Sequence, residues 1–120
     1  METLDGEEEM IKRTREEVLR LWVKALRSGE YRQGQGFLRE TIQGKSHFCC
    51  LGVLADLAKK DGGPKWKACT DVIAEINGDE SFLPKSWEDW LKIKQKRLAK
   101  MNDQGKSFAQ IADYIERNYK

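Results

Sequence analysis

The most reactive side chains of this sequence gather in residues 46–57, Ser-His-Phe-Cys-Cys-Leu-Gly-Val-Leu-Ala-Asp-Leu. This stretch holds the single histidine, His47, and two of the three cysteines, Cys49 and Cys50. Thiols can bind a metal, attack a substrate as thiolates, or pack as small apolar groups. Adjacent cysteines project in different directions, and no Cys-x-x-Cys spacing is present, so we expect no metal site.

Thiol catalysis has one argument for it and one against it. The sequence predicts a helix beginning near Cys50, and the N-terminus of a helix favours a thiolate. A cysteine nucleophile also needs a histidine within hydrogen-bond reach. His47 is the single candidate, and it lies three residues earlier, in the predicted preceding strand. We therefore expect no catalytic residue, and a cysteine-dependent hydrolase stays an alternative.

We favour the interpretation that this stretch is buried in the core. Phe48, Leu51 and Leu54 form an apolar block with the cysteines, which are among the most buried residue types. Gly52 would let another backbone or a ligand approach closely. We expect one of the two cysteines to pack in the core and the other to line a cleft without doing chemistry.

A glycine-rich, basic segment lies just upstream and offers groups for ligand binding. Arginines form forked hydrogen bonds with carboxylate or phosphate, glutamines donate and accept, and glycines allow close approach. Together they predict a site for a small anionic ligand, with a solvated hairpin as the alternative. The candidate ligand-binding residues are Arg27, Tyr31, Arg32, Gln33, Gln35, Arg39, Lys45, His47, Cys49 and Cys50.

The elements that must position these residues follow from hydrophobic spacing and turn residues. Helical spacing predicts a first helix from about Glu7 to Arg27, ended by Ser28-Gly29. A β-hairpin is predicted from Phe37–Thr41 and Ser46–Cys49, with its turn at Gln43-Gly44-Lys45. A second helix is predicted from Cys50 to Lys60.

The second half of the chain is predicted to be mostly helical. Within residues 66–82 we favour a small second hairpin, because Asn77-Gly78-Asp79 is a turn signal. Ser86 is expected to cap the next helix, which is followed by a helical stretch around Leu98 and Met101. Asn102-Asp103-Gln104-Gly105 is expected to break the chain, and Ser107 with Gln110 forms a capping box for the last helix.

Length and composition indicate one small α+β domain over residues 1–120, with an N-terminal helix, a small antiparallel sheet built from hairpins, and C-terminal helices. Residues 1–6 are expected to be a flexible acidic lead. Residues 1–9 carry five acids and no base, so the rest of the chain is basic and suits an anionic partner. No apolar run approaches the about 20 residues that span a bilayer, and no signal peptide is visible. An odd number of cysteines then favours reduced thiols in a cytosol.

Two motifs resemble functional signatures but lack parts that those signatures require. Gly-Lys-Ser occurs at 44–46 and 105–107, but each copy lacks the upstream glycine of a P-loop. The stretch Leu98–Asp113 is similar to the start of a helix-turn-helix, yet too few residues follow it for a recognition helix. We expect no sequence-specific DNA binding.

Several motifs, in this order, resemble a widespread family of small proteins encoded by tailed phages and prophages. They are Trp-Val-Lys-Ala-Leu-Arg-Ser-Gly-Glu-Tyr-Arg-Gln at 22–33, Phe-Cys-Cys-Leu-Gly-Val-Leu at 48–54, and Asn-Asp-Gln-Gly-Lys-Ser-Phe-Ala-Gln-Ile-Ala-Asp at 102–113. The resemblance covers the chain from about Leu21 to Glu116. Where this chain has Ala55, many members have a third cysteine, which argues against a required metal site. The resemblance implies a phage origin and a host bacterial cytoplasm, but no reaction.

We therefore expect a phage accessory protein without cofactors that is not an enzyme and sequesters a small anionic, nucleotide-type signal of host defence. The alternative is a protein-binding inhibitor of a host enzyme, anchored by a tryptophan-rich helix such as Trp87–Lys94. A homo-oligomer, with Leu19 or Trp22 at its interface, is left open. We expect no membrane association.

Overall fold

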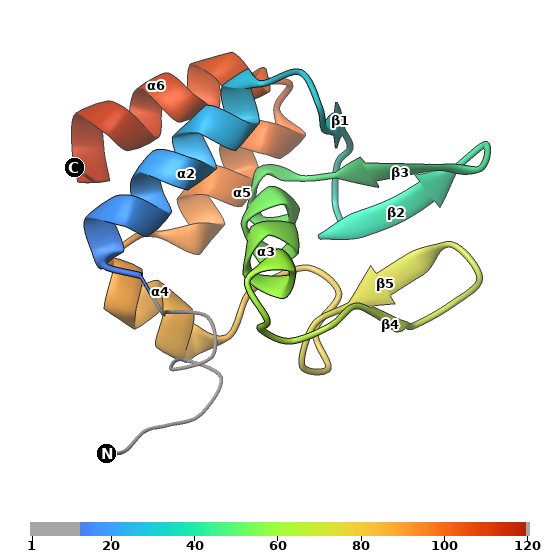
Figure 1. Cartoon of the computed structure of the whole chain (residues 1–120). Helices are drawn as coiled ribbons and strands as arrows, with labels where there is room; N and C mark the ends of the chain where they lie inside the picture. Colours follow the sequence, from blue (N-terminus) through green and yellow to red (C-terminus); the bar gives the residue numbers. More distant parts are fainter. Residues whose placement is uncertain (1–12, 120) are drawn as a thin grey trace, which may run out of the picture.

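The computed structural model describes residues 13–119, in which five helices lie beside a five-stranded mixed sheet (Figure 1). The α+β fold class is thereby confirmed. The helix α3 stands between the sheet and the other helices (Figure 1) and packs on α2, α5 and β3. The helices are α2 (Arg15–Arg27), α3 (Cys50–Lys60), α4 (Lys85–Leu91), α5 (Gln95–Asp103) and α6 (Phe108–Tyr119). The strands are β1 (Arg32–Gln33), β2 (Arg39–Ile42), β3 (Lys45–Phe48), β4 (Lys67–Ala68) and β5 (Ile73–Glu75).

The sheet has the strand order β1-β3-β2-β5-β4. The pairs β2–β3, β2–β5 and β4–β5 are antiparallel, as expected for a sheet built from hairpins. The sequence does not predict β1, a two-residue strand that pairs with β3 in parallel. The strand forms because the chain that leaves α2 runs alongside β3. Gly36, with a φ of +85°, then helps to turn the chain towards β2.

The first described helix begins later than the sequence predicts. Thr14 caps α2, because its hydroxyl accepts a 3.1 Å hydrogen bond from the backbone N–H of Glu17. The Glu17 carboxylate accepts one of 2.8 Å from the N–H of Thr14 in return. The prediction of one continuous helix from Glu7 to Arg27 is therefore wrong, because α2 begins after its N-cap, Thr14. Residues 7–12 and the acidic lead lie outside the described residues.

Both predicted hairpins are present, with shifted bounds. Gln43 and Gly44 have positive φ angles of 51° and 78° and make the two-residue turn between β2 and β3. The second hairpin lies within residues 67–75. The Asn77-Gly78 signal marks a separate turn, closed by hydrogen bonds of 2.9 and 3.0 Å between Ile76 and Asp79.

The helix α3 has the predicted bounds, but the predicted cap of α4 is wrong. The N-cap of α4 is Pro84, whose carbonyl accepts a 3.0 Å hydrogen bond from the N–H of Trp87. Ser86 lies inside the first turn of the helix and therefore cannot cap it. The capping box of Ser107 and Gln110 before α6 is confirmed, with hydrogen bonds of 2.9 and 3.1 Å.

The core fills the space between the helices and the inner side of the sheet. The fully buried Trp22 donates its indole N–H to the carbonyl of Cys50 at 2.9 Å. Leu19 is also fully buried, so neither residue is free to form the oligomer interface left open above. The expected close approach at Gly52 is confirmed, since a Cβ there would overlap the backbone of Leu38. Within the described residues, no helix has the length and apolarity to cross a membrane.

Candidate functional site

The two glutamines expected to bind a ligand instead hold the fold together. Gln33 donates from its amide nitrogen to the side-chain oxygen of Asn102 at 2.9 Å and to the carbonyl of Lys106 at 2.7 Å. Its amide oxygen accepts from the N–H of Phe108 at 3.2 Å, at the start of α6. Gln35 donates to the carbonyl of Asn102 at 3.3 Å. The polar atoms of Gln33 are therefore engaged by α5 and α6 and do not face a ligand.

Asn102 is the polar centre of this contact, although its sequence context, Asn102–Gly105, predicts a break in the chain. It is fully buried in α5. Its side-chain oxygen also accepts from the N–H of Cys50 at 3.2 Å, and its amide nitrogen donates to the carbonyl of Gly34 at 2.6 Å. No local pattern marks it, because all three partners are distant in sequence.

The adjacent cysteines are core residues, and neither is suited to catalysis. Cys49 and Cys50 are 4% and 0% exposed. Burial raises the pKa of Cys49 to about 11 and that of Cys50 well above its ordinary value. Desolvation therefore outweighs the thiolate-favouring effect of the helix N-terminus. The expectation that one of them lines a cleft is wrong, since both are buried.

Arg27 and Tyr31 also have partners inside the fold. Arg27 forms ion pairs of 2.6 and 2.9 Å with Asp113 and Glu116 of α6. The hydroxyl of Tyr31 donates to the Asp56 carboxylate at 2.8 Å and accepts from the ammonium of Lys60 at 3.1 Å. Through these contacts the side chains of Arg27 and Tyr31 stabilise the packing of the fold.

Asp56 joins Tyr31 to a second aromatic residue, Trp66. Its other carboxylate oxygen accepts from the indole N–H of Trp66 at 3.0 Å. Burial alone would raise the pKa of Asp56, but the hydrogen bonds from Trp66 and Tyr31 and the charge of Lys60 lower it. Phe48 lies between the two rings, with centroid distances of 5.1 Å to Tyr31 and 6.1 Å to Trp66. The rings form a fixed aromatic cluster on one face of the sheet.

The remaining cationic candidates are divided between the two faces of the sheet. Arg39 is paired with Phe48 in the β2–β3 register, so it shares the face of the aromatic cluster. Arg32 is paired with His47, one position along, and therefore lies on the opposite face. Lys45, two residues from His47, shares that opposite face. The prediction that these cations form one cluster is therefore wrong, because strand alternation places them on different faces.

Arg39 borders a hollow of about 240 Å³ over β2, β4 and β5, here called the Arg39 hollow. Its guanidinium lies 5.5 Å from the ring centroid of Trp66 and 5.9 Å from that of Phe48. Its Nε donates to the Ser46 hydroxyl at 3.2 Å, and no carboxylate within the described residues pairs with it. The lining is Arg39, Thr41, Trp66, Lys67, Ala68, Thr70, Asp71, Val72, Ile73 and Ala74.

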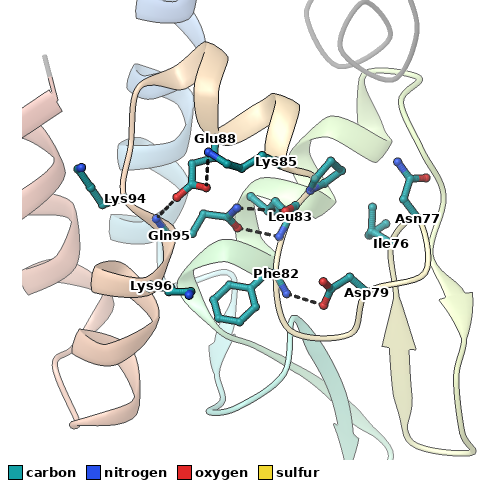
Figure 2. Close-up of a pocket in the computed structure, with 11 residues that line it drawn as sticks. Ile76, Asn77, Asp79, Phe82, Leu83, Lys85, Glu88, Lys94, Gln95 and Lys96 are labelled. Atoms are coloured by element: carbon teal, nitrogen blue, oxygen red, sulfur yellow. Dashed lines mark hydrogen bonds and ion pairs between the residues drawn. The ribbon is translucent and has the colours of Figure 1, made fainter.

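A larger pocket of about 610 Å³ lies between the Ile76–Pro84 segment and the start of α5, as Figure 2 shows. The sequence does not predict this pocket, because its walls come from three separate segments. This Phe82 pocket is lined by Ile76, Asn77, Asp79, Phe82, Leu83, Pro84, Lys85, Glu88, Lys94, Gln95 and Lys96. Among the residues that the structure describes, no group of three or more histidine, cysteine, aspartate or glutamate side chains is placed to hold a metal.

The tryptophans of α4, the expected anchors of a protein-binding inhibitor, pack largely within this chain. Trp87 is fully buried, and Trp90 is half-buried against the core. A tryptophan that already fills the core of its own chain cannot insert into a partner. The helix α4 therefore presents less aromatic surface than its sequence suggests.

The fold and its hollows define a small α+β domain with a depression on one sheet face that Arg39 and Trp66 border. The chain belongs to the family described as Domain of unknown function (DUF8296), whose model matches residues 14–98. That match runs from the cap of α2 into α5 and includes both hollows. No curated protein and no solved structure matches the chain. The resemblance to tailed-phage proteins stays a prediction.

Proposed function

We propose that this protein is a non-enzymatic binder of a small anionic, nucleotide-type ligand, which it holds in the Arg39 hollow. The observation that carries the proposal is the guanidinium of Arg39, fixed by two aromatic rings and a hydroxyl but without a carboxylate partner in the described part of the chain. An arginine held in this way keeps N–H groups for a phosphate and loses little side-chain entropy when it binds.

The surroundings of Arg39 favour a phosphorylated ligand with an aromatic part. Thr41 and Thr70 in the lining add hydroxyl groups that can donate to a phosphate. The ring of Trp66 is held at its N–H by Asp56, so it offers a fixed apolar surface beside the charge. Asp71 in the lining opposes anion binding, so the phosphate contact rests on Arg39.

The resemblance to phage proteins supplies the biological setting of the proposal. In that setting the protein sequesters a nucleotide-type defence signal in the cytoplasm of the bacterial host. Sequestration needs affinity and abundance but no nucleophile, which agrees with the buried, protonated thiols of Cys49 and Cys50.

The test is a thermal-shift screen of the full chain against phosphorylated metabolites and bacterial signalling nucleotides. A ligand at 100 times its dissociation constant stabilises the protein by about 2.7 kcal/mol, which raises Tm by several degrees. Arg39→Ala should abolish the shift. Arg32→Ala is the matched control, because it removes the same charge from the opposite face of the sheet.

Two results would contradict the proposal. A panel that leaves Tm unchanged at millimolar concentrations would argue against a nucleotide ligand and favour the protein-binding alternative. A shift lost equally in Arg32→Ala and Arg39→Ala would show that net charge, and not the Arg39 hollow, is responsible.

A further inference from the structure

We propose that the Phe82 pocket is a separate binding site for a small organic anion that carries an apolar ring or chain. At about 610 Å³ it falls in the size range of small-molecule sites. The Phe82 pocket is independent of the Arg39 hollow, because the two share no lining residue.

The walls of the pocket are held in place by their own hydrogen bonds. The side chain of the buried Gln95 accepts from the N–H of Leu83 at 2.7 Å and donates to its carbonyl at 3.0 Å, as Figure 2 shows. Asp79 accepts from the N–H groups of Ser81 and Phe82 at 2.8 and 2.9 Å. The pocket is therefore formed before a ligand arrives, which lowers the cost of binding.

The acidic groups in these walls are already engaged. Glu88 accepts from the backbone N–H of Gln95 at 2.8 Å, and its other oxygen lies 3.8 Å from the ammonium of Lys85. One oxygen of Asp79 holds the turn that carries Phe82. The pocket therefore offers little to a cation, and its apolar surface comes from Ile76, Phe82, Leu83 and Pro84.

The cations at the rim lack this internal pairing. Lys94 and Lys96 are exposed, and neither forms an ion pair within residues 13–119. They belong to the run Lys-Ile-Lys-Gln-Lys-Arg at 92–97, which contains no acid. The run sets a positive potential at the mouth of an apolar pocket. An exposed lysine binds a bare anion only weakly, so the ligand must also bury apolar surface on Phe82.

The experiment titrates the full chain with three naphthalene probes and follows the backbone amides by NMR. The probes are 1-naphthoate, 1-naphthyl phosphate and the neutral 1-naphthalenemethanol. We expect both anions to shift the amides of Asn77, Phe82 and Lys96, and the tighter of the two to identify the preferred head group. The neutral alcohol should bind about tenfold more weakly.

Variants separate this pocket from the rest of the surface. The double variant Lys94→Gln, Lys96→Gln should weaken the anions about tenfold, whereas Lys59→Gln, Lys100→Gln removes the same charge elsewhere and should not. Arg39→Ala should leave the amide chemical-shift changes intact, so this test does not depend on whether the Arg39 hollow binds a ligand. Equal binding of the neutral alcohol, equal loss in the two double variants, or no shift at millimolar probe would overturn the proposal.

Discussion

The side-chain oxygen of Asn102, in α5, accepts a 3.2 Å hydrogen bond from the backbone N–H of Cys50, the first residue of α3. The N-cap of α3, Cys49, makes no side-chain capping bond of its own. Asn102 therefore supplies, from another helix, an acceptor for one of the backbone N–H groups that the first turn of α3 leaves without an intrahelical partner. The same side chain binds Gln33 and Gly34, so it joins α3, α5 and the start of the sheet.

Replacing Asn102 with alanine should destabilise the protein by on the order of 3 kcal/mol, because several buried polar groups lose their partner at once. The measurement is urea unfolding followed by circular dichroism. Gln35→Ala is the control, since its single 3.3 Å bond lies at an exposed position, and it should cost less than about 1 kcal/mol. Equal losses in the two variants would contradict the central role of Asn102.

Gly52→Ala should be among the most destabilising single substitutions in the chain, costing about 3 kcal/mol or more. The added methyl group would overlap the backbone of Leu38, which cannot move aside as a flexible side chain would. Gly36→Ala meets no atom within 4 Å and pays only for its positive φ, about 1 kcal/mol. Thermal unfolding of both variants checks the difference, and similar Tm values would disprove the close approach.

Iodoacetamide should modify Cys69 alone in the folded protein at pH 8. Cys69 is exposed, whereas Cys49 and Cys50 are buried, and burial raises the pKa of Cys49 to about 11. A hydrogen bond to Glu80 raises the pKa of Cys69, so Glu80→Gln should speed its reaction. Mass spectrometry counts the adducts, and unfolded protein provides the three-adduct reference. Rapid labelling of Cys50 would revive the cysteine-hydrolase alternative.

Stability should fall in acid partly through Asp56. Its pKa in the folded protein lies below its ordinary value, so its stabilisation is present above about pH 4 and is lost as the pH falls through the folded-state pKa. Asp56→Asn should therefore lose less stability than the wild type between pH 7 and pH 3. Asp89→Asn, at an exposed carboxylate, should keep the wild-type slope. Urea titrations at each pH give the comparison, and identical slopes for Asp56→Asn and the wild type would refute it.

The sequence predicts those elements whose signals are local. The bounds of α3 follow from its apolar spacing and from Asp61-Gly62, and the Ser107–Gln110 capping box marks the start of α6. The turn at Gln43-Gly44 needs two positive φ angles, of which glycine adopts its own freely, so Gly44 is the local signal for the turn. Each of these features lies within a few residues of its cause.

Features that depend on distant partners could not be predicted in this way. The strand β1 exists because β3 lies beside it, and its own two residues carry no strand signal. The sequence points to Arg39 but not to Trp66, which lies two residues before Ala68 and reaches the same face because Ala68 and Arg39 both pair with Ala74. Arg32 and Lys45 are cationic residues close to Arg39 along the chain, yet the strand register places them on the other face.

The packing of α2 on α6 has a consequence for how the protein is made. Arg15 and Arg27, at the two ends of α2, both bind α6, and the ion pair of Arg27 with Asp113 spans 86 residues. At translation rates of roughly 5–20 residues per second, α2 waits on the order of ten seconds for this partner. Throughout that interval the apolar stripe of Val18, Leu19, Trp22 and Leu26 is uncovered by α6 on the nascent chain. We therefore expect this apolar stripe to stay exposed on the nascent chain until residues 108–119 have left the ribosome.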